Sequence, residues 1–223
     1  MLAGDTQEAR WWRLESGRST DSAAAPVLLL AHGAGLGADS PWMESMSAAL
    51  VERGITVVRF EFPFMARQRS EERKRPPDPM PALAACFRSQ VDRAQALYDA
   101  PLFVGGKSMG GRVASLLAAE AADGLAGAVC FGFPFHPPAK PLSWRTGHFK
   151  DFKVPVKIIQ GSRDPFGKPV EMEAHPEVAR YASLEWLDSG DHDFRPLRRS
   201  GRCQAGLMDE AATLAADFMH AIR

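Results

Sequence analysis

Short runs of aliphatic and aromatic residues recur along the chain, and most are followed by a longer segment with helical spacing. The first run, 27–31, is apolar at every position instead of alternating with polar residues. An uninterrupted run of this kind indicates a strand that is covered on both faces, as in a parallel sheet. On the same grounds the sequence predicts strands over 27–31, 55–60, 102–105, 128–131, 154–160 and 183–187.

The segments between these runs carry apolar residues at spacings of three and four. The last one, 203–222, has a single apolar stripe made of Leu207, Ala211, Leu214, Phe218 and Ile222. Similar patterns predict helices over 42–53, 80–98, 109–122, 169–181 and 203–222. Alternating strands and helices of this length predict an α/β fold, a doubly wound and mostly parallel sheet flanked by helices, with residues 1–223 as one domain. In such sheets functional residues gather at the carboxyl ends of the strands.

Composition and charge narrow the classes of partner. The 223 residues include 27 Lys and Arg against 27 Asp and Glu, so the formal net charge is zero. A neutral chain has no overall field to attract nucleic acid or an anionic membrane, and neither is expected as a partner. A small-molecule substrate is therefore the expected partner, and the sequence does not predict an oligomeric state.

The cysteines and the lack of a long apolar run predict a cytoplasmic protein. The three cysteines, Cys86, Cys130 and Cys203, are odd in number and far apart, so neither a disulfide framework nor a zinc cage is expected. No apolar run approaches the roughly 20 residues that span a bilayer. We expect no metal and no cofactor.

The glycine-rich stretch 105–111 is the strongest motif for chemistry. It contains Gly106-x-Ser108-x-Gly110 between a predicted strand and a predicted helix, where a strained turn lifts a serine hydroxyl above the sheet. A plain glycine-rich turn is the alternative, and this context disfavours it. A phosphate-binding loop is excluded because Pro101 stands where that motif needs a glycine.

A second glycine-rich stretch, 32–38, can be interpreted in two ways. Gly33-x-Gly35-x-x-Ala38 fits a dinucleotide fingerprint, and Glu61 lies where a ribose-binding carboxylate would, which would indicate NAD-linked redox chemistry on a Rossmann fold. That fingerprint needs a helix starting within the glycines, whereas Asp39-Ser40-Pro41 looks like a later helix start. The preferred interpretation is an oxyanion-hole loop, with the backbone N–H groups of Ala34 and Met109 as donors.

A nucleophilic serine needs a base and a carboxylate that orients it. The order Ser108, Asp164, His192 is the order found in α/β-hydrolases, and Asp164 and His192 each follow a predicted strand. Alone, Asp164 would be a common turn residue and His192 an exposed loop histidine. Together with Ser108 they predict a catalytic triad. Asp188, Asp191 and Asp193 are the other candidates for the orienting acid.

These stretches together resemble the α/β-hydrolase superfamily, and within it the small dienelactone-hydrolase-like proteins, nearest to the KANL/Tex-type group. The resembling segments run from residue 27 to the end of the chain, and Phe135-His136-Pro137-Pro138 is the stretch that indicates the group. The resemblance implies a hydrolase fold with a minimal lid and an esterase-like site, without a particular substrate.

Several residues have a weaker assignment. His136 and Gly35 are candidates for substrate contacts, although a loop histidine held by proline packing is an equal alternative for His136. The charged run 67–75 is expected to be a solvated loop, and 133–149 to complete a shallow pocket. The leading hypothesis is a cofactor-free serine esterase for a small substrate; a Rossmann oxidoreductase and a non-catalytic binding scaffold are the alternatives.

Overall fold

The chain folds around one mixed sheet of seven strands in the order β1-β3-β2-β4-β5-β6-β7. The computed structural model describes residues 10–14, 24–120 and 124–222. All neighbouring strands run parallel except β1, which pairs antiparallel with β3 at one edge. The strands are β1 Trp11–Leu14, β2 Val27–Ala31, β3 Thr56–Phe60, β4 Leu102–Lys107, β5 Leu125–Phe131, β6 Val156–Gly161 and β7 Ser183–Leu187.

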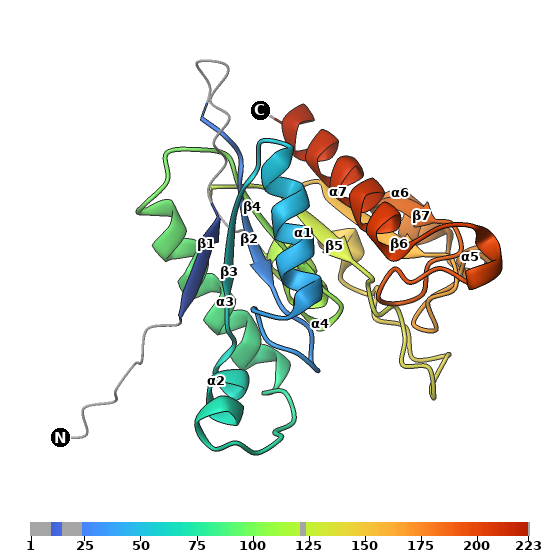
Figure 1. Ribbon diagram of the computed structural model, residues 1–223, viewed down its shortest axis with the longest axis horizontal. Helices are drawn as coiled ribbons and strands as arrows, with labels where there is room; N and C mark the ends of the chain where they lie inside the picture. The colour runs from blue at the N-terminus through green and yellow to red at the C-terminus, as the bar shows by residue number, and fades with distance from the viewer. Residues whose placement is uncertain (1–9, 15–23, 121–123, 223) are drawn as a thin grey trace.

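Helices cover both faces of the sheet, as Figure 1 shows. Along β2, Leu28 and Leu30 belong to one buried cluster, and Val27, Leu29 and Ala31 belong to the other. Two separate hydrophobic layers explain why this strand has no polar position. The first layer holds α1 Pro41–Glu52 and α7 Gln204–Ala221; the second holds α2 Pro63–Ser70, α3 Met80–Gln95, α4 Met109–Ala119 and α6 Pro176–Tyr181.

The observed elements confirm the predicted fold class, with local differences. The stretch 169–181 forms two short helices, α5 Pro169–Met172 and α6, because Pro176 begins a new helix and cannot continue the previous one. The run 67–75 is not entirely a loop, since its first residues form the last turn of α2. The sequence patterns missed both α2 and the edge strand β1.

The register of the parallel strands brings several loops to one edge. Ala31 of β2 pairs with Gly106 of β4, and Lys107 pairs with Phe131 of β5. Further along, Gly161 of β6 pairs with Leu187 of β7. The loops that follow β2, β4, β5, β6 and β7 therefore start side by side, and they contain the candidate site residues except Met109, which begins α4.

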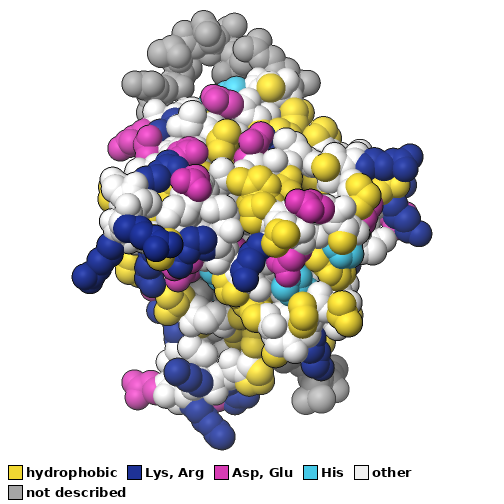
Figure 2. Space-filling view, turned by 90° about the vertical axis from the view of Figure 1, so that its right-hand side faces the viewer, with side chains coloured by type: hydrophobic (Ala, Val, Ile, Leu, Met, Phe, Trp, Pro, Cys, Tyr) yellow, Lys and Arg dark blue, Asp and Glu magenta, His cyan; other side chains and the backbone are white. Residues whose placement is uncertain are grey.

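Acidic and basic side chains are interspersed on the surface. In Figure 2 dark blue and magenta side chains alternate around the face that carries the β7 edge, with hydrophobic side chains between them. This mixture agrees with the zero net charge. None of the helices in the described part of the chain combines the length and the apolar content that crossing a bilayer requires.

Candidate active site

Ser108 occupies a strained turn between β4 and α4. Its φ of 52° and ψ of −113° lie in a region that non-glycine residues seldom adopt. A Cβ on Gly106 would lie 2.4 Å from the carbonyl carbon of Gly110, and one on Gly110 would lie 2.5 Å from the carbonyl oxygen of Ala31. The glycines that flank the serine are therefore required by the close approach of β2, β4 and α4.

Asp164 and His192 are joined at the carboxyl edge of the sheet. Asp164 Oδ2 lies 2.7 Å from His192 Nδ1, and the Asp164 side chain is completely buried. The same oxygen accepts a hydrogen bond from Gln160 Nε2 at 2.9 Å, and Oδ1 accepts one from the N–H of Phe166 at 2.9 Å. The Phe166 ring packs on the imidazole at 4.5 Å. These contacts hold the carboxylate and the ring in one orientation.

The other acidic residues near His192 have different partners. Asp191 Oδ1 accepts hydrogen bonds from the N–H groups of Asp193 and Arg195, which closes a local turn. The Asp193 carboxylate lies 3.4 Å from Lys107 Nζ, and Asp188 is exposed. Neither Asp191 nor Asp193 contacts the imidazole, so the geometry favours Asp164 among the four candidates.

Ser108 and His192 approach each other across Gly132. The N–H of Ser108 donates to the carbonyl oxygen of Phe131 at 2.9 Å, so the serine lies beside Gly132, and a Cβ at Gly132 would be 3.3 Å from His192 Nδ1. Both residues lie in the described part of the chain, and no hydrogen bond joins Ser108 Oγ to His192 Nε2 there. Catalytic hydrogen bonds often become short only when substrate is bound.

His32 fixes the backbone of the loop that faces Ser108. Its Nε2 accepts a hydrogen bond from the N–H of Phe62 at 3.0 Å, so the proton is on Nδ1, which donates to the Gly33 carbonyl oxygen at 2.7 Å. Burial lowers the pKa of His32 to about 4, so the ring is neutral at pH 7. Because a trans peptide is rigid, the orientation of the Gly33 carbonyl also sets the direction of the Ala34 N–H. Sequence reasoning noted His32 only as the start of a motif.

Ala34 and Gly35 lie at the exposed tip of this loop. The loop approaches the Ser108 turn closely, since a Cβ on Gly33 would lie 3.8 Å from Ser108 Cβ. Met109 begins α4, and the first N–H groups of a helix have no acceptor within the helix. Gly33, which precedes Ala34, therefore lies next to the Ser108 turn, and Met109 follows that turn directly.

The far end of the same loop is held by arginines. Arg69 Nε lies 2.8 Å from Glu61, and its Nη2 contacts Asp39. A Cβ on Gly37 would lie 2.6 Å from Arg69 Nη2, so a larger residue there would have to displace this ion pair. Glu61 is therefore engaged with an arginine, and α1 begins at Pro41, beyond the glycines. This geometry lacks the helix N-terminus that a dinucleotide fingerprint uses.

Lys107 contacts the loop that carries His192. Its ammonium donates a hydrogen bond to the carbonyl oxygen of His192 and lies 5.5 Å from the ring centre of Trp42 and 5.9 Å from that of Phe194. Burial lowers the pKa of Lys107 below its usual value, while the Asp193 carboxylate opposes this shift. This role could not be predicted from the sequence, because it depends on contacts with residues far along the chain.

His136 is packed within its own loop. It is only 2% exposed, its Nε2 lies 3.1 Å from Glu171, and its ring packs on Trp144 at 5.4 Å. Its backbone N–H donates to the carbonyl oxygen of Phe166 at 3.2 Å. These contacts match the alternative of a loop histidine held by packing, and they link the 133–149 segment to the loop that carries Asp164.

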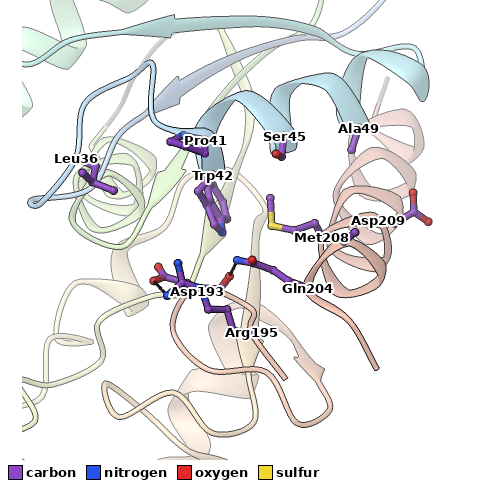
Figure 3. Close-up of a pocket in the computed structure, with 11 residues that line it drawn as sticks. Leu36, Pro41, Trp42, Ser45, Ala49, Asp193, Arg195, Gln204, Met208 and Asp209 are labelled. Carbon is purple, nitrogen blue, oxygen red and sulfur yellow. Dashed lines mark hydrogen bonds and ion pairs between the residues drawn. The ribbon is translucent and has the colours of Figure 1, made fainter. Parts of the chain in front are cut away.

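A pocket of about 440 Å³ lies next to the His192 loop, between α1 and α7. Figure 3 shows Trp42 and Met208 pointing into it from these two helices. Leu36 of the His32 loop and Asp193 also line it, so it adjoins both sides of the candidate site. No residue of 133–149 lines this pocket. Within the described residues, no group of three or more His, Cys, Asp or Glu is placed to hold a metal ion.

Comparisons with solved structures find the same fold. Est1E from Butyrivibrio proteoclasticus is similar with a TM-score of 0.70 at 14% identity, covering 95% of this chain and 94% of that chain. A dienelactone hydrolase from Anabaena variabilis gives a TM-score of 0.68 at 20% identity, covering 96% and 99%. The Pyrococcus furiosus esterase Pf2001 gives 0.67 at 15% identity, covering 96% and 87%.

The sequence itself also matches a family. Residues 24–220 match the profile described as an alpha/beta hydrolase domain. The matched span contains every candidate site residue and six of the seven strands, all except β1. The expected dienelactone-hydrolase-like fold is confirmed, and the family supports a hydrolase. On the strength of this match over most of its length, the chain belongs to the alpha/beta hydrolase domain family.

Proposed function

We propose that this protein is a serine hydrolase that cleaves an ester or related acyl bond of a small substrate, with Ser108, His192 and Asp164 as its catalytic triad. The observation that carries the proposal is the 2.7 Å contact between buried Asp164 and His192 at the sheet edge where the strained Ser108 turn emerges. Orienting an imidazole beside an activated serine is the arrangement that acyl transfer requires.

In the proposed mechanism Ser108 Oγ attacks the substrate carbonyl while His192 Nε2 takes the hydroxyl proton. Asp164 accepts the hydrogen bond from Nδ1 and stabilises the imidazolium that forms. The protonated His192 then gives its proton to the leaving alcohol, which leaves an acyl group on Ser108. Water attacks this acyl-enzyme with His192 again acting as base, which releases the acid and restores Ser108.

The developing oxyanion needs preorganised donors. We assign them to the N–H groups of Ala34, which follows Gly33 in the loop near Ser108, and of Met109, which follows Ser108. The neutral His32 ring holds the peptide that contains the Ala34 N–H, and the positive end of α4 adds a favourable field at Met109. Charge stabilisation by backbone groups requires no metal ion.

A fluorophosphonate probe tests the proposal. Such a probe phosphonylates an activated serine and releases fluoride, so labelling followed by peptide mapping should place the adduct on Ser108. Ser108→Ala and Asp164→Asn should each abolish or strongly slow the labelling. Labelling of another serine would contradict the assignment, and absence of labelling in the folded wild-type protein would favour a non-catalytic scaffold.

A further inference from the structure

Two arginines on the α4 side of the candidate site lack a carboxylate partner. Arg112 lies in α4 and Arg145 in the loop after β5, and both are half-buried. Neither pairs with an Asp or Glu within 10–14, 24–120 or 124–222. More exposed arginines do have such partners, as in the pairs Arg67 with Asp78, Arg88 with Glu120 and Arg202 with Glu210. A buried charge usually needs a counter-charge more than an exposed one does, because it is less hydrated. Here these more exposed arginines are paired with carboxylates, and within the described residues the two half-buried ones are not.

Arg112 follows the candidate nucleophile by one turn of α4. Its N–H donates to the Ser108 carbonyl oxygen at 3.0 Å, so the two residues are one helical turn apart. Side chains on a helix lean toward its N-terminus, and the N-terminus of α4 is the Ser108 turn. Arg112 Nε is fully enclosed and has no hydrogen-bond acceptor. This guanidinium group therefore lies near the catalytic edge with one donor unused.

Arg145 reaches the same edge from the neighbouring loop. Its N–H donates to the Phe135 carbonyl oxygen at 2.8 Å, and its Nη1 donates a long hydrogen bond to the Pro134 carbonyl oxygen at 3.4 Å. Pro134 follows closely on Gly132, where a Cβ would lie 3.3 Å from His192 Nδ1. The second guanidinium group is thus hydrogen-bonded to a segment that starts next to the imidazole.

The loop that carries Arg145 packs on α4 at the level of Arg112. Ser115 Oγ lies 2.8 Å from both the Arg112 carbonyl oxygen and His148 Nε2. Burial and, after it, the charge of Arg145 lower the pKa of Arg112, and the charge of Arg112 helps burial to lower the pKa of His148 to about 4. The charge of Arg145 therefore acts on Arg112, and His148, which contacts Ser115, is neutral at pH 7.

We propose that Arg112 and Arg145 form an anion-binding subsite that receives a carboxylate carried by the ester substrate. This inference rests on the proposed function and specifies its substrate class. Planar guanidinium groups match the two oxygens of a carboxylate, and a bound carboxylate would relieve the repulsion between the two cations. The subsite is separate from the apolar pocket between α1 and α7, which leaves that pocket for an uncharged part of the substrate.

The test compares two esters that differ only at the terminus of the acyl chain. Mono-4-nitrophenyl glutarate ends in a carboxylate, and 4-nitrophenyl pentanoate ends in a methyl group on a chain with the same number of carbons. The readout is the ratio of their kcat/KM values within each variant, so that a general loss of activity cancels. We expect the wild type to prefer the anionic ester by about tenfold or more, since hydrogen bonds to charged groups are stronger than those between neutral groups.

Arg145→Gln and Arg112→Gln should each lower this ratio by about tenfold, and Arg145→Lys, which keeps a cation, should retain part of it. Arg73→Gln is the control, because it removes the same charge from an exposed position in the charged loop. A preference that survives in both glutamine variants would overturn the subsite. So would a preference that Arg73→Gln removes equally, which would indicate a long-range field.

A binding measurement keeps the two proposals distinguishable. Calorimetric titration of glutarate into Ser108→Ala needs no turnover. The double variant that also carries Arg145→Gln should bind glutarate about tenfold or more weakly. If the wild type hydrolyses neither ester while glutarate binding depends on Arg145, the proposed function fails and the anion subsite stands. If the wild type hydrolyses both esters equally and glutarate does not bind, the subsite is wrong and the serine hydrolase assignment stands.

Discussion

The ammonium group of Lys107 donates a hydrogen bond to the carbonyl oxygen of His192, so the residue before the candidate nucleophile holds the loop that carries the candidate base. Serine and histidine come from different parts of the chain, and this contact couples their positions directly. The ammonium also packs over Trp42 and near the Asp193 carboxylate. A single buried cation thus sets the distance between the nucleophile turn and the imidazole.

Removing that cation should reduce turnover more than binding. Lys107→Met keeps most of the aliphatic volume but loses the hydrogen bond, so we expect kcat to fall by about 10- to 100-fold with KM changed by about twofold or less. Lys157→Met is a matched control, because Lys157 is similarly buried but contacts Ser183 and Glu185 near the start of β7. Steady-state kinetics on a 4-nitrophenyl ester measure both constants. An unchanged kcat in Lys107→Met would exclude the positioning role.

The choice of acid can be tested by three single substitutions. Asp164→Asn should lower kcat by roughly 10⁴, because the amide can no longer stabilise the imidazolium or fix its tautomer. Asp191→Asn and Asp193→Asn should cost about tenfold or less, since these carboxylates contact backbone N–H groups and Lys107 instead of the imidazole. Near wild-type turnover in Asp164→Asn, together with collapse in either of the others, would reassign the acid.

The donor role of Ala34 has a backbone-specific test. Ala34→Pro removes the N–H and should lower kcat by about 10²–10³, whereas Ala34→Gly keeps it and should be mild. His32→Ala should fall between the two, because the Ala34 peptide loses the hydrogen bond that orients it but keeps its donor. Equal kcat values for the proline and glycine variants would remove Ala34 from the oxyanion hole.

His32, which is buried, and His148, which is half-buried, should make the protein sensitive to acid. Burial lowers the pKa of both His32 and His148 from 6.5 to about 4. Between these values the unfolded chain binds more protons than the folded one, so the free energy of unfolding should fall as the pH drops from about 6.5 to about 4.

Urea unfolding at several pH values checks this dependence. Each histidine contributes a slope of at most about 1.4 kcal/mol per pH unit. His148→Asn should therefore make the profile less steep in this range. An equally steep profile in His148→Asn would show that this ring does not resist protonation in the folded state.

The parts of the fold that could be predicted are those that local pattern determines. β2 is apolar at every position, β3 carries Val57, Val58 and Phe60, and α7 has one continuous stripe, so each is recognisable without its neighbours. α2 buries only Phe64 and Met65 and ends in the polar stretch 67–70, which belongs to the charged run that was expected to be a loop. β1 is a short edge strand whose extended form depends on pairing with β3.

The candidate site also has parts that local sequence predicts and parts that it does not. Gly106, Ser108 and Gly110 carry a local motif, and the order of Ser108, Asp164 and His192 along the chain is a family pattern. The parts played by Lys107, His32 and the Arg112–Arg145 pair arise from contacts between distant segments, and no local spacing encodes them. A lysine next to a serine or a histidine before a glycine becomes informative only when its buried partner is known.

The identity of the nucleophile is the central claim, and turnover of 4-nitrophenyl acetate by Ser108→Ala tests it most directly. The control is Ser115→Ala, because Ser115 is also hydrogen-bonded to a histidine, His148, but lies buried within α4. Our account expects Ser108→Ala to keep its fold and lose several orders of magnitude in kcat, while Ser115→Ala keeps most of it. More than about a tenth of wild-type activity in purified Ser108→Ala would contradict the assignment of Ser108 as the nucleophile.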